Sequence, residues 1–342
     1  MSELRVQSPD PAVAVIMNPS AGTAAACPLT AQRDELAAAG IPVFDGGGPS
    51  VARAFVANVL EQGVRGLIVS GGDGTLHRVL NALREVADPT EWPAIALCPA
   101  GTTNLLAGRV GLPGPECLVD HVRETPQPER WSTIPVRTVD VGGRLGIVAG
   151  AGFMEQASRA FGRGPDRYGK VAAWAALEVL GAIVGLRSPE WLRVSSPLHA
   201  VDDLGAAVET GEGVPLTGLA FTAEPAVARL FSAVTPADGG GLHVLAAGGE
   251  PGPMLRQGLG SLFRLRRASR QATVRRDDSV TLARGTRIML DGEYFIANSD
   301  TVVSEGPTFR LFHPTFAGLR TFPLLAFHTV DRRAERSLRH AA

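Results

Sequence analysis

Residues 66–83 read GLIVSGGDGTLHRVLNAL, in which an apolar run leads through a glycine-rich turn into a helical pattern. The run at 66–70 predicts a buried strand, and residues 75–86 predict the helix that follows it. Glycine at such a junction lets backbone N–H groups approach phosphate oxygens, and the positive end of the helix dipole favours negative charge there. The stretch therefore predicts a phosphate-binding turn, with four candidate contacts: Gly71, Gly72, Gly74 and Thr75.

Asp73 stands inside this turn, where an anion beside a phosphate costs free energy. The cost is offset if Asp73 orients a magnesium ion, an acceptor hydroxyl, or a hydrogen-bond network that holds the loop. An aspartate that only caps the helix is the structural alternative. The residues of the turn alone leave these roles open.

The same alternation of strands and helices fills the first third of the chain. Strands are expected at 12–17, 42–44, 66–70 and 94–98, and helices at 29–39, 51–62, 75–86 and 105–110. This alternation predicts an α/β nucleotide-binding domain with a parallel sheet, which we place at residues 1–131. Residues 132–314 are expected to form a second, β-rich domain, with strands at 136–141, 145–149, 216–221 and 242–245.

Two further polar turns follow apolar strands in the first domain, NPSAG at 18–22 and GTTN at 101–104. In open α/β sheets, ligands bind at the edge where the carboxyl ends of the strands meet. We therefore expect both turns to join the glycine-rich turn around a nucleotide. The candidate contacts that they contribute are Asn18, Pro19, Ser20, Gly22, Gly101, Thr102, Thr103 and Asn104.

Composition excludes several classes of protein. The 342 residues include 33 basic and 34 acidic side chains, so the chain lacks the positive field of a nucleic-acid binder. Three cysteines without paired spacing fit neither a disulfide framework nor a zinc site. Residues 1–11 carry no signal-peptide core, and the longest apolar run, 171–186, is too short for a bilayer span. We expect a cytoplasmic protein whose membrane contact is peripheral.

The order of the three turns, with VLNAL after GGDGTL, resembles the diacylglycerol kinase catalytic domain family, which is related to sphingosine kinases and distantly to NAD kinases. Further matches lie at GAGF (150–153), YGK (168–170) and LDGE (290–293), so the resemblance covers nearly the whole chain. It implies the two-domain NAD kinase/diacylglycerol kinase-like fold. The second domain, residues 132–314, is then β-sandwich-like and serves the lipid substrate, and residues 315–342 pack back on the first domain.

The resemblance also implies an activity, ATP-dependent transfer of a phosphoryl group to a lipid hydroxyl with Mg²⁺ present. Glu293 becomes the candidate general base and Asp73 the second catalytic acid, while Asp291 and Asp238 become candidate metal ligands. A carboxylate suits the base because it can accept the hydroxyl proton during transfer. Without the upstream turns, Asp291-Gly292 would be read as an ordinary hairpin turn.

Several positions depart from the family pattern. The pair His77-Arg78 stands where Asn-Glu or His-Glu is usual, and Leu105 stands where an aspartate is common. The segment 223–243 is divergent as well, and His243 stands there where an acid is expected. These changes leave two alternatives open. One is a non-catalytic homologue that binds nucleotide or lipid as a regulatory module, and the other is an NAD kinase-like enzyme that phosphorylates a soluble hydroxyl.

Residues 263–276 read FRLRRASRQATVRR, with six arginines and no acidic residue. Each basic residue near an anionic bilayer contributes about 1 kcal/mol, so this segment predicts docking on an anionic membrane surface; a solvated face is the alternative. The helix expected at 170–186 packs in the core or faces lipid. The expected partners are thus a lipid substrate, diacylglycerol or a related alcohol, and a membrane, with a homodimer left open. Further candidates for phosphate contacts are Arg78, Arg109, Arg163, Arg167 and Lys170.

Overall fold

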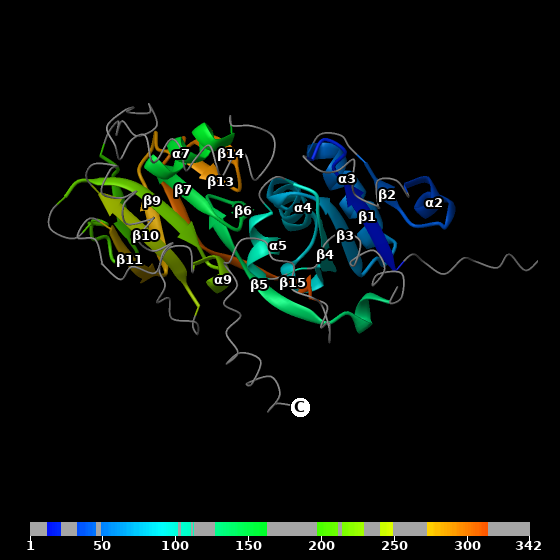
Figure 1. Cartoon of the computed structure of the whole chain (residues 1–342). Helices are drawn as coiled ribbons and strands as arrows, with labels where there is room; N and C mark the ends of the chain where they lie inside the picture. The colour runs from blue at the N-terminus through cyan, green and yellow to red at the C-terminus, as the bar shows by residue number, and fades with distance from the viewer. Residues whose placement is uncertain are drawn as a thin grey trace, which may run out of the picture.

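The computed structural model describes residues 12–21, 33–45, 49–101, 104–110, 112, 127–162, 197–210, 214–228, 240–248 and 272–313. They form an α/β half and a β-rich half that lie side by side (Figure 1). Within these ranges, no helix combines the length and the apolar character that a bilayer span requires.

The first half is built on four parallel strands in the order β2-β1-β3-β4. These strands are β1 (Val13–Met17), β2 (Val43–Phe44), β3 (Gly66–Gly71) and β4 (Ala94–Pro99). Every residue of β1 and β3 is buried, which explains why both strands read as continuous apolar runs. The expected parallel α/β layer is confirmed.

Four helices accompany these strands, close to the expected positions. They are α2 (Arg33–Ala38), α3 (Pro49–Glu61), α4 (Asp73–Val86) and α5 (Leu105–Val110). Helix α4 packs Leu76, Leu80 and Leu83 into the same core as Leu67 and Val69 of β3. Because this apolar face is fully buried, α4 is held firmly behind the strand that leads into it.

The second half places a six-stranded antiparallel sheet against the remaining strands of the first sheet. The six-stranded sheet has the order β11-β10-β9-β7-β13-β14. Its strands are β7 (Ala149–Gly152), β9 (Leu216–Thr222), β10 (Leu242–Gly248), β11 (Ala272–Asp277), β13 (Arg287–Leu290) and β14 (Glu293–Ile296). Short helices α7 (Phe153–Gly162) and α9 (Pro225–Ala228) accompany it.

Opposite that sheet lie the strands that extend the first sheet into the second half. They are β5 (Thr133–Val141), β6 (Arg144–Gly146), β8 (Ala200–Asp202), β12 (Ser279–Leu282) and β15 (Thr301–Phe312). One apolar cluster fills the space between the two layers, with Val139 and Val303 from one sheet and Leu219 and Val244 from the other. This arrangement confirms the β-sandwich-like second half.

Strands β5 and β15 join the halves (Figure 1). Strand β15 pairs with β12 near its start and with β5 along its length, and Leu311 near its end pairs with Ile95 of β4 in parallel. The nine-stranded sheet therefore crosses the predicted domain boundary at residue 131. That boundary stays a prediction, and residues 315–342, expected to pack on the first half, lie outside the described ranges.

One expected strand is interrupted. Residues 145–149 were predicted to form one strand, but β6 ends at Gly146 and β7 begins at Ala149. The break occurs because the backbone N–H groups of Ile147 and Val148 donate to the carboxylate of Asp291 instead of to a neighbouring strand. A side chain distant in sequence thus ends the ladder.

Candidate functional site

The three polar turns of the first half meet at one edge of the sheet, because each follows one of the adjacent parallel strands β1, β3 and β4. The Nδ2 group of Asn18 donates to Oγ1 of Thr75 at 3.1 Å, which ties the first turn to the second. The second and third turns touch through their backbones: a Cβ atom added to Gly101 would lie 2.3 Å from Cα of Gly72. The predicted convergence is therefore present.

Asparagine side chains hold the outer two turns in shape. Oδ1 of Asn18 accepts from the N–H of Ser20 at 3.0 Å. Asn104 has a φ of 46° and bonds Gly101 twice, accepting from its N–H at 3.0 Å and donating to its carbonyl at 2.7 Å. Asparagine tolerates this left-handed conformation better than most residues, so its presence at position 104 has a local reason.

Asp73 sits at the first position of α4, yet it caps a different helix. Its carboxylate accepts from the N–H groups of Leu105 at 2.9 Å and Leu106 at 3.4 Å, at the start of α5. Burial raises the pKa of Asp73, and these two N–H groups act in the opposite direction. Of the roles left open for Asp73, the contacts match the network that holds the loop; its catalytic role stays a prediction.

Asp291 and Gly292 form the two-residue turn between β13 and β14, in which Leu290 pairs with Glu293. Both turn residues have positive φ, 49° and 88°, as a type I′ hairpin requires. The side chain of Asp291, however, is only 3% exposed. Its carboxylate accepts from the N–H of Ile147 at 2.9 Å and from that of Val148 at 2.9 Å. The turn is thus an ordinary hairpin that also anchors a buried acid.

The charge of Asp73 acts on the buried carboxyl group of Asp291. Burial raises the pKa of Asp291 to about 7, and the nearby charge of Asp73 pushes the pKa in the same direction. An added Cβ on Gly74 would lie 4.0 Å from the carbonyl oxygen of Asp291, so the hairpin abuts the first turn of α4. The LDGE hairpin therefore reaches the glycine-rich turn from a distant part of the chain.

Asn81 fixes α4 to the second half. Its Nδ2 group donates to the carbonyl of Leu145 at 2.8 Å, and its Oδ1 accepts from the N–H of Leu145 at 3.0 Å. The side-chain amide thus forms with Leu145 the same pair of hydrogen bonds that a neighbouring strand would form on this edge of β6. The sequence motif VLNAL carries this contact, which the sequence alone did not reveal.

Glu293 lies at the start of β14, where its side chain is 49% exposed. Nη2 of Arg78 lies 3.3 Å from its Oε1. His77, on the preceding position of α4, places its Nδ1 3.8 Å from Oδ2 of Asp291, and burial lowers the pKa of His77. Two of the residues that depart from the family pattern, His77 and Arg78, therefore face the DGE motif.

Some predicted site residues lie outside the described ranges. These are Gly22, Thr102, Thr103, Arg163, Arg167, Lys170 and Asp238, together with residues 170–186 and 263–271. The side chain of Arg109 also lies outside them. The contacts expected of these residues therefore stay predictions.

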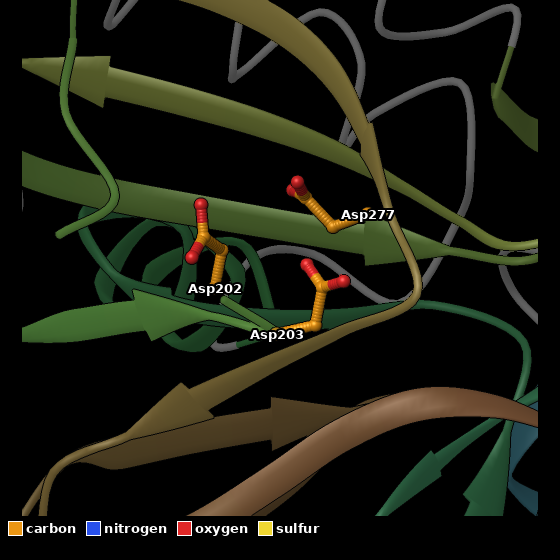
Figure 2. A group of neighbouring side chains, drawn as sticks. All are labelled: Asp202, Asp203 and Asp277. Carbon is orange, nitrogen blue, oxygen red and sulfur yellow. The ribbon is translucent and has the colours of Figure 1, made fainter. Parts of the chain in front are cut away.

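A separate acidic cluster lies in the second half, formed by Asp202, Asp203 and Asp277 (Figure 2). Arg275 joins two of its members: its Nη2 lies 2.8 Å from Oδ2 of Asp202, and its Nε donates to Oδ1 of Asp277 at 2.9 Å. The hydrogen bond from Arg275 lowers the pKa of Asp202, whereas burial raises that of Asp277. These contacts describe an ion-pair network, which the sequence analysis missed. They also engage one of the six arginines assigned to a membrane surface.

Known proteins resemble this chain in sequence and in fold. Residues 12–129 match the family model of the diacylglycerol kinase catalytic domain. A protein named probable lipid kinase YegS-like, from Chromohalobacter salexigens, is 39% identical over 67 residues, which are 20% of this chain and 21% of that protein. Another of that name, from Stenotrophomonas maltophilia, is 40% identical over 65 residues, 18% of this chain and 20% of its own length. The matched region thus spans about a fifth of these relatives.

The fold is shared over a much greater length. A solved structure of a diacylglycerol kinase from Bacillus anthracis superposes with a TM-score of 0.58 at 14% sequence identity, and the match covers 89% of this chain and 97% of that one. The predicted fold class is confirmed, and the family resemblance is confirmed for residues 12–129.

Proposed function

Since residues 12–129 match the diacylglycerol kinase catalytic domain family, we propose that the chain is a lipid kinase that transfers the γ-phosphoryl group of ATP to a hydroxyl of diacylglycerol or a related lipid alcohol. The observation that carries the proposal is the approach of the DGE hairpin to the glycine-rich turn, with Gly74 near the backbone of Asp291. A phosphate-binding turn and a candidate base are thereby brought together from positions more than two hundred residues apart.

The nucleotide phosphates bind at the start of α4 in this proposal. Gly71 and Gly72 precede a helix of 14 residues, whose N-terminal end and dipole favour an anion. The side chain of Thr75 closes against Gly71, since a Cβ on that glycine would lie 2.3 Å from Oγ1. Asn18 holds this hydroxyl by its 3.1 Å hydrogen bond, so the turn is pre-organised before a ligand arrives.

Glu293 acts as the general base. Its carboxylate is half exposed at the tip of the hairpin, so an acceptor hydroxyl can reach it. The base takes the hydroxyl proton as the hydroxyl oxygen forms its bond to phosphorus and the bond from phosphorus to the β–γ bridging oxygen breaks, releasing ADP. Asp73 and Asp291, both engaged by backbone N–H groups, hold the loops in place, and Asp73 remains the second candidate catalytic acid.

Magnesium fits this site best as an ion carried on the ATP phosphates. Mg²⁺ keeps several waters and binds through one or two carboxylates together with phosphate oxygens. The carboxylates of Asp73 and Asp291 already accept backbone N–H bonds, so neither offers a bare pair of oxygens. When bound, the ion supplies charge neutralisation on the phosphates. Glu293 is the nearby acid that is open to solvent.

The lipid acceptor implies work at a membrane surface. We propose a cytoplasmic protein that docks reversibly on anionic bilayers through residues 263–271, where four of the six arginines lie. Arg275 takes no part in this docking, because it is held between Asp202 and Asp277.

The test is transfer of labelled γ-phosphate from ATP, with magnesium, to lipids in mixed micelles. Diacylglycerol and other lipid alcohols are compared with NAD as a soluble acceptor. Glu293→Gln is expected to lose at least about 10²-fold in rate, because proton removal contributes about that much. Glu85→Gln is the matched control, since Glu85 is also an exposed glutamate paired with an arginine, at 3.2 Å.

A wild-type rate retained by E293Q would remove the base from its role. Product formed only from NAD would favour the NAD kinase-like alternative. ATP binding without product from any acceptor would favour a non-catalytic module, for which the Arg78–Glu293 ion pair is the motivating contact.

A further inference from the structure

We propose that Arg78 binds a phosphoryl oxygen beside the acceptor hydroxyl, so that Arg78 and Glu293 form one recognition unit for a phosphorylated group. The inference rests on the proposed function, in which Glu293 engages that hydroxyl. It assigns a role to a residue whose charge is opposite to the glutamate that the family resemblance implies at this position.

The geometry leaves the guanidinium group of Arg78 available. Arg78 lies in the second turn of α4, one turn beyond Gly74. Its contact with Glu293 is a single one, at 3.3 Å, although a guanidinium group carries five N–H donors. The side chain is 54% exposed. Within the described part of the chain, Glu293 is its one hydrogen-bonding partner, so most of its donors face solvent beside the candidate base.

The charge around Glu293 is locally positive. Arg144 lies with its guanidinium carbon 4.4 Å from the centroid of the Phe295 ring, on the same strand as Glu293. The charges of Arg144 and Arg78 both lower the pKa of His77, so both cations lie near the imidazole ring of His77. Within the described residues, the half-exposed carboxylate of Glu293 thus has Arg78 beside it and Arg144 against Phe295 of the same strand, whereas the whole chain is nearly neutral, with 33 basic and 34 acidic residues. Such a local excess attracts anions.

The distances allow base and anion contact at once. A general base works within about 2.6–3.2 Å of the hydroxyl that it deprotonates. Because Arg78 lies 3.3 Å from the carboxylate oxygen of Glu293, a phosphoryl group on or beside that hydroxyl comes within reach of its free N–H donors. Arginine suits this task, since its planar fork can bind two phosphate oxygens.

The phosphoryl group can have two sources with the same chemistry. It is either the γ-phosphoryl group of ATP as it is transferred or a phosphate that the acceptor lipid already carries next to its hydroxyl. The competing explanation is an ordinary surface ion pair that joins α4 to the hairpin, which is worth at most about 1 kcal/mol and binds no ligand.

The experiment compares Arg78→Met with Arg53→Met. Arg53 pairs with Glu85 at 3.2 Å with exposures of 59% and 57%, which match the 54% and 49% of Arg78 and Glu293. Calorimetry gives the affinity of each protein for MgATP and MgADP. Sedimentation gives its binding to phosphatidylcholine vesicles that contain either diacylglycerol or phosphatidylglycerol. Labelled phosphate transfer is measured in parallel, and Arg78→Lys tests whether the fork or only the charge is needed.

A loss of at least about tenfold in MgATP affinity, without loss for MgADP, is expected if the group is the γ-phosphoryl. A similar loss confined to phosphatidylglycerol vesicles would identify the acceptor's phosphate, and either loss supports the inference. If R78M matches R53M in every arm while the wild type transfers phosphate, the inference fails and the kinase stands. If the wild type transfers none but R78M still weakens binding, the kinase fails and the phosphoryl site stands.

Discussion

Gly101→Ala tests the contact on which the convergence of the phosphate-facing turns depends. A Cβ at residue 101 would lie 2.3 Å from Cα of Gly72 and 3.0 Å from its nitrogen. Carbon atoms rest about 3.5 Å apart, so the two turns would have to separate by about 1 Å. Both neighbours are backbone atoms, which cannot rotate out of the way as a side chain would. The separation is therefore expected in the whole loop.

The expected cost is that of overpacking, about 1–3 kcal/mol in the free energy of unfolding. Nucleotide binding should weaken as well, because the turns would lose the arrangement in which they are pre-organised. Urea unfolding followed by tryptophan fluorescence measures the first effect, and titration with MgATP measures the second.

Gly108→Ala is the control for this substitution. Gly108 lies within α5, and a Cβ there meets nothing within 4 Å. Alanine should stabilise the protein by about 0.5–1 kcal/mol, because glycine is the poorer helix former. The two substitutions, seven residues apart, are thus expected to have opposite signs. A G101A protein as stable as the wild type, with unchanged MgATP affinity, would refute the reasoning about the turns.

Three further substitutions test the anchoring contacts. Asn81→Asp keeps the acceptor for the N–H of Leu145 but loses the donor to the carbonyl of Leu145. The substitution should therefore lower the free energy of unfolding in urea by about 1–3 kcal/mol. An unchanged urea midpoint would contradict the role of this amide. Asp291 has its pKa raised to about 7, so between about pH 4 and pH 7 the folded state holds a proton that the unfolded state has released. The free energy of unfolding should therefore fall as pH rises through this window, by up to about 4 kcal/mol. Asp291→Asn should flatten the profile of urea midpoint against pH. A profile in the variant that runs parallel to that of the wild type would show that another group is responsible. Arg275→Met should lower the urea midpoint, because it removes the shared partner of Asp202 and Asp277. Arg276→Met changes an exposed neighbour and should alter the midpoint little. Equal effects of the two substitutions would argue against the network.

The α/β half was predictable because its signals are local. Strands β1 and β3 are buried on both faces, so they appear in the sequence as unbroken apolar runs, and the polar turns follow them directly. Parallel strands bring such turns to one edge whatever the remaining details are. The convergence of Asn18, Thr75 and Asn104 follows from that rule, and the hydrogen bonds found there agree with it.

The contacts between distant segments were not predictable in the same way. The break at Ile147 and Val148 depends on a carboxylate more than 140 residues away, and nothing in the local pattern indicates it. The same holds for Asp73, which caps α5 although its place in the sequence suggests a cap for α4. Arg275 appeared to belong to a basic segment because the sequence does not show which side chains face it across the sandwich.

Strand β15 has a consequence for the order in which the protein can fold during synthesis. The ribosome completes β1 to β4 early, but β15, which pairs with β4 through Leu311 and Ile95, emerges about two hundred residues later. Until then β4 is an open edge whose residues from Ala94 to Leu97 are apolar and become buried in the finished sheet. Exposed edges of this kind pair readily with other chains. A fragment that stops at residue 131 should therefore aggregate, and the nascent chain depends on late residues to protect its earliest sheet.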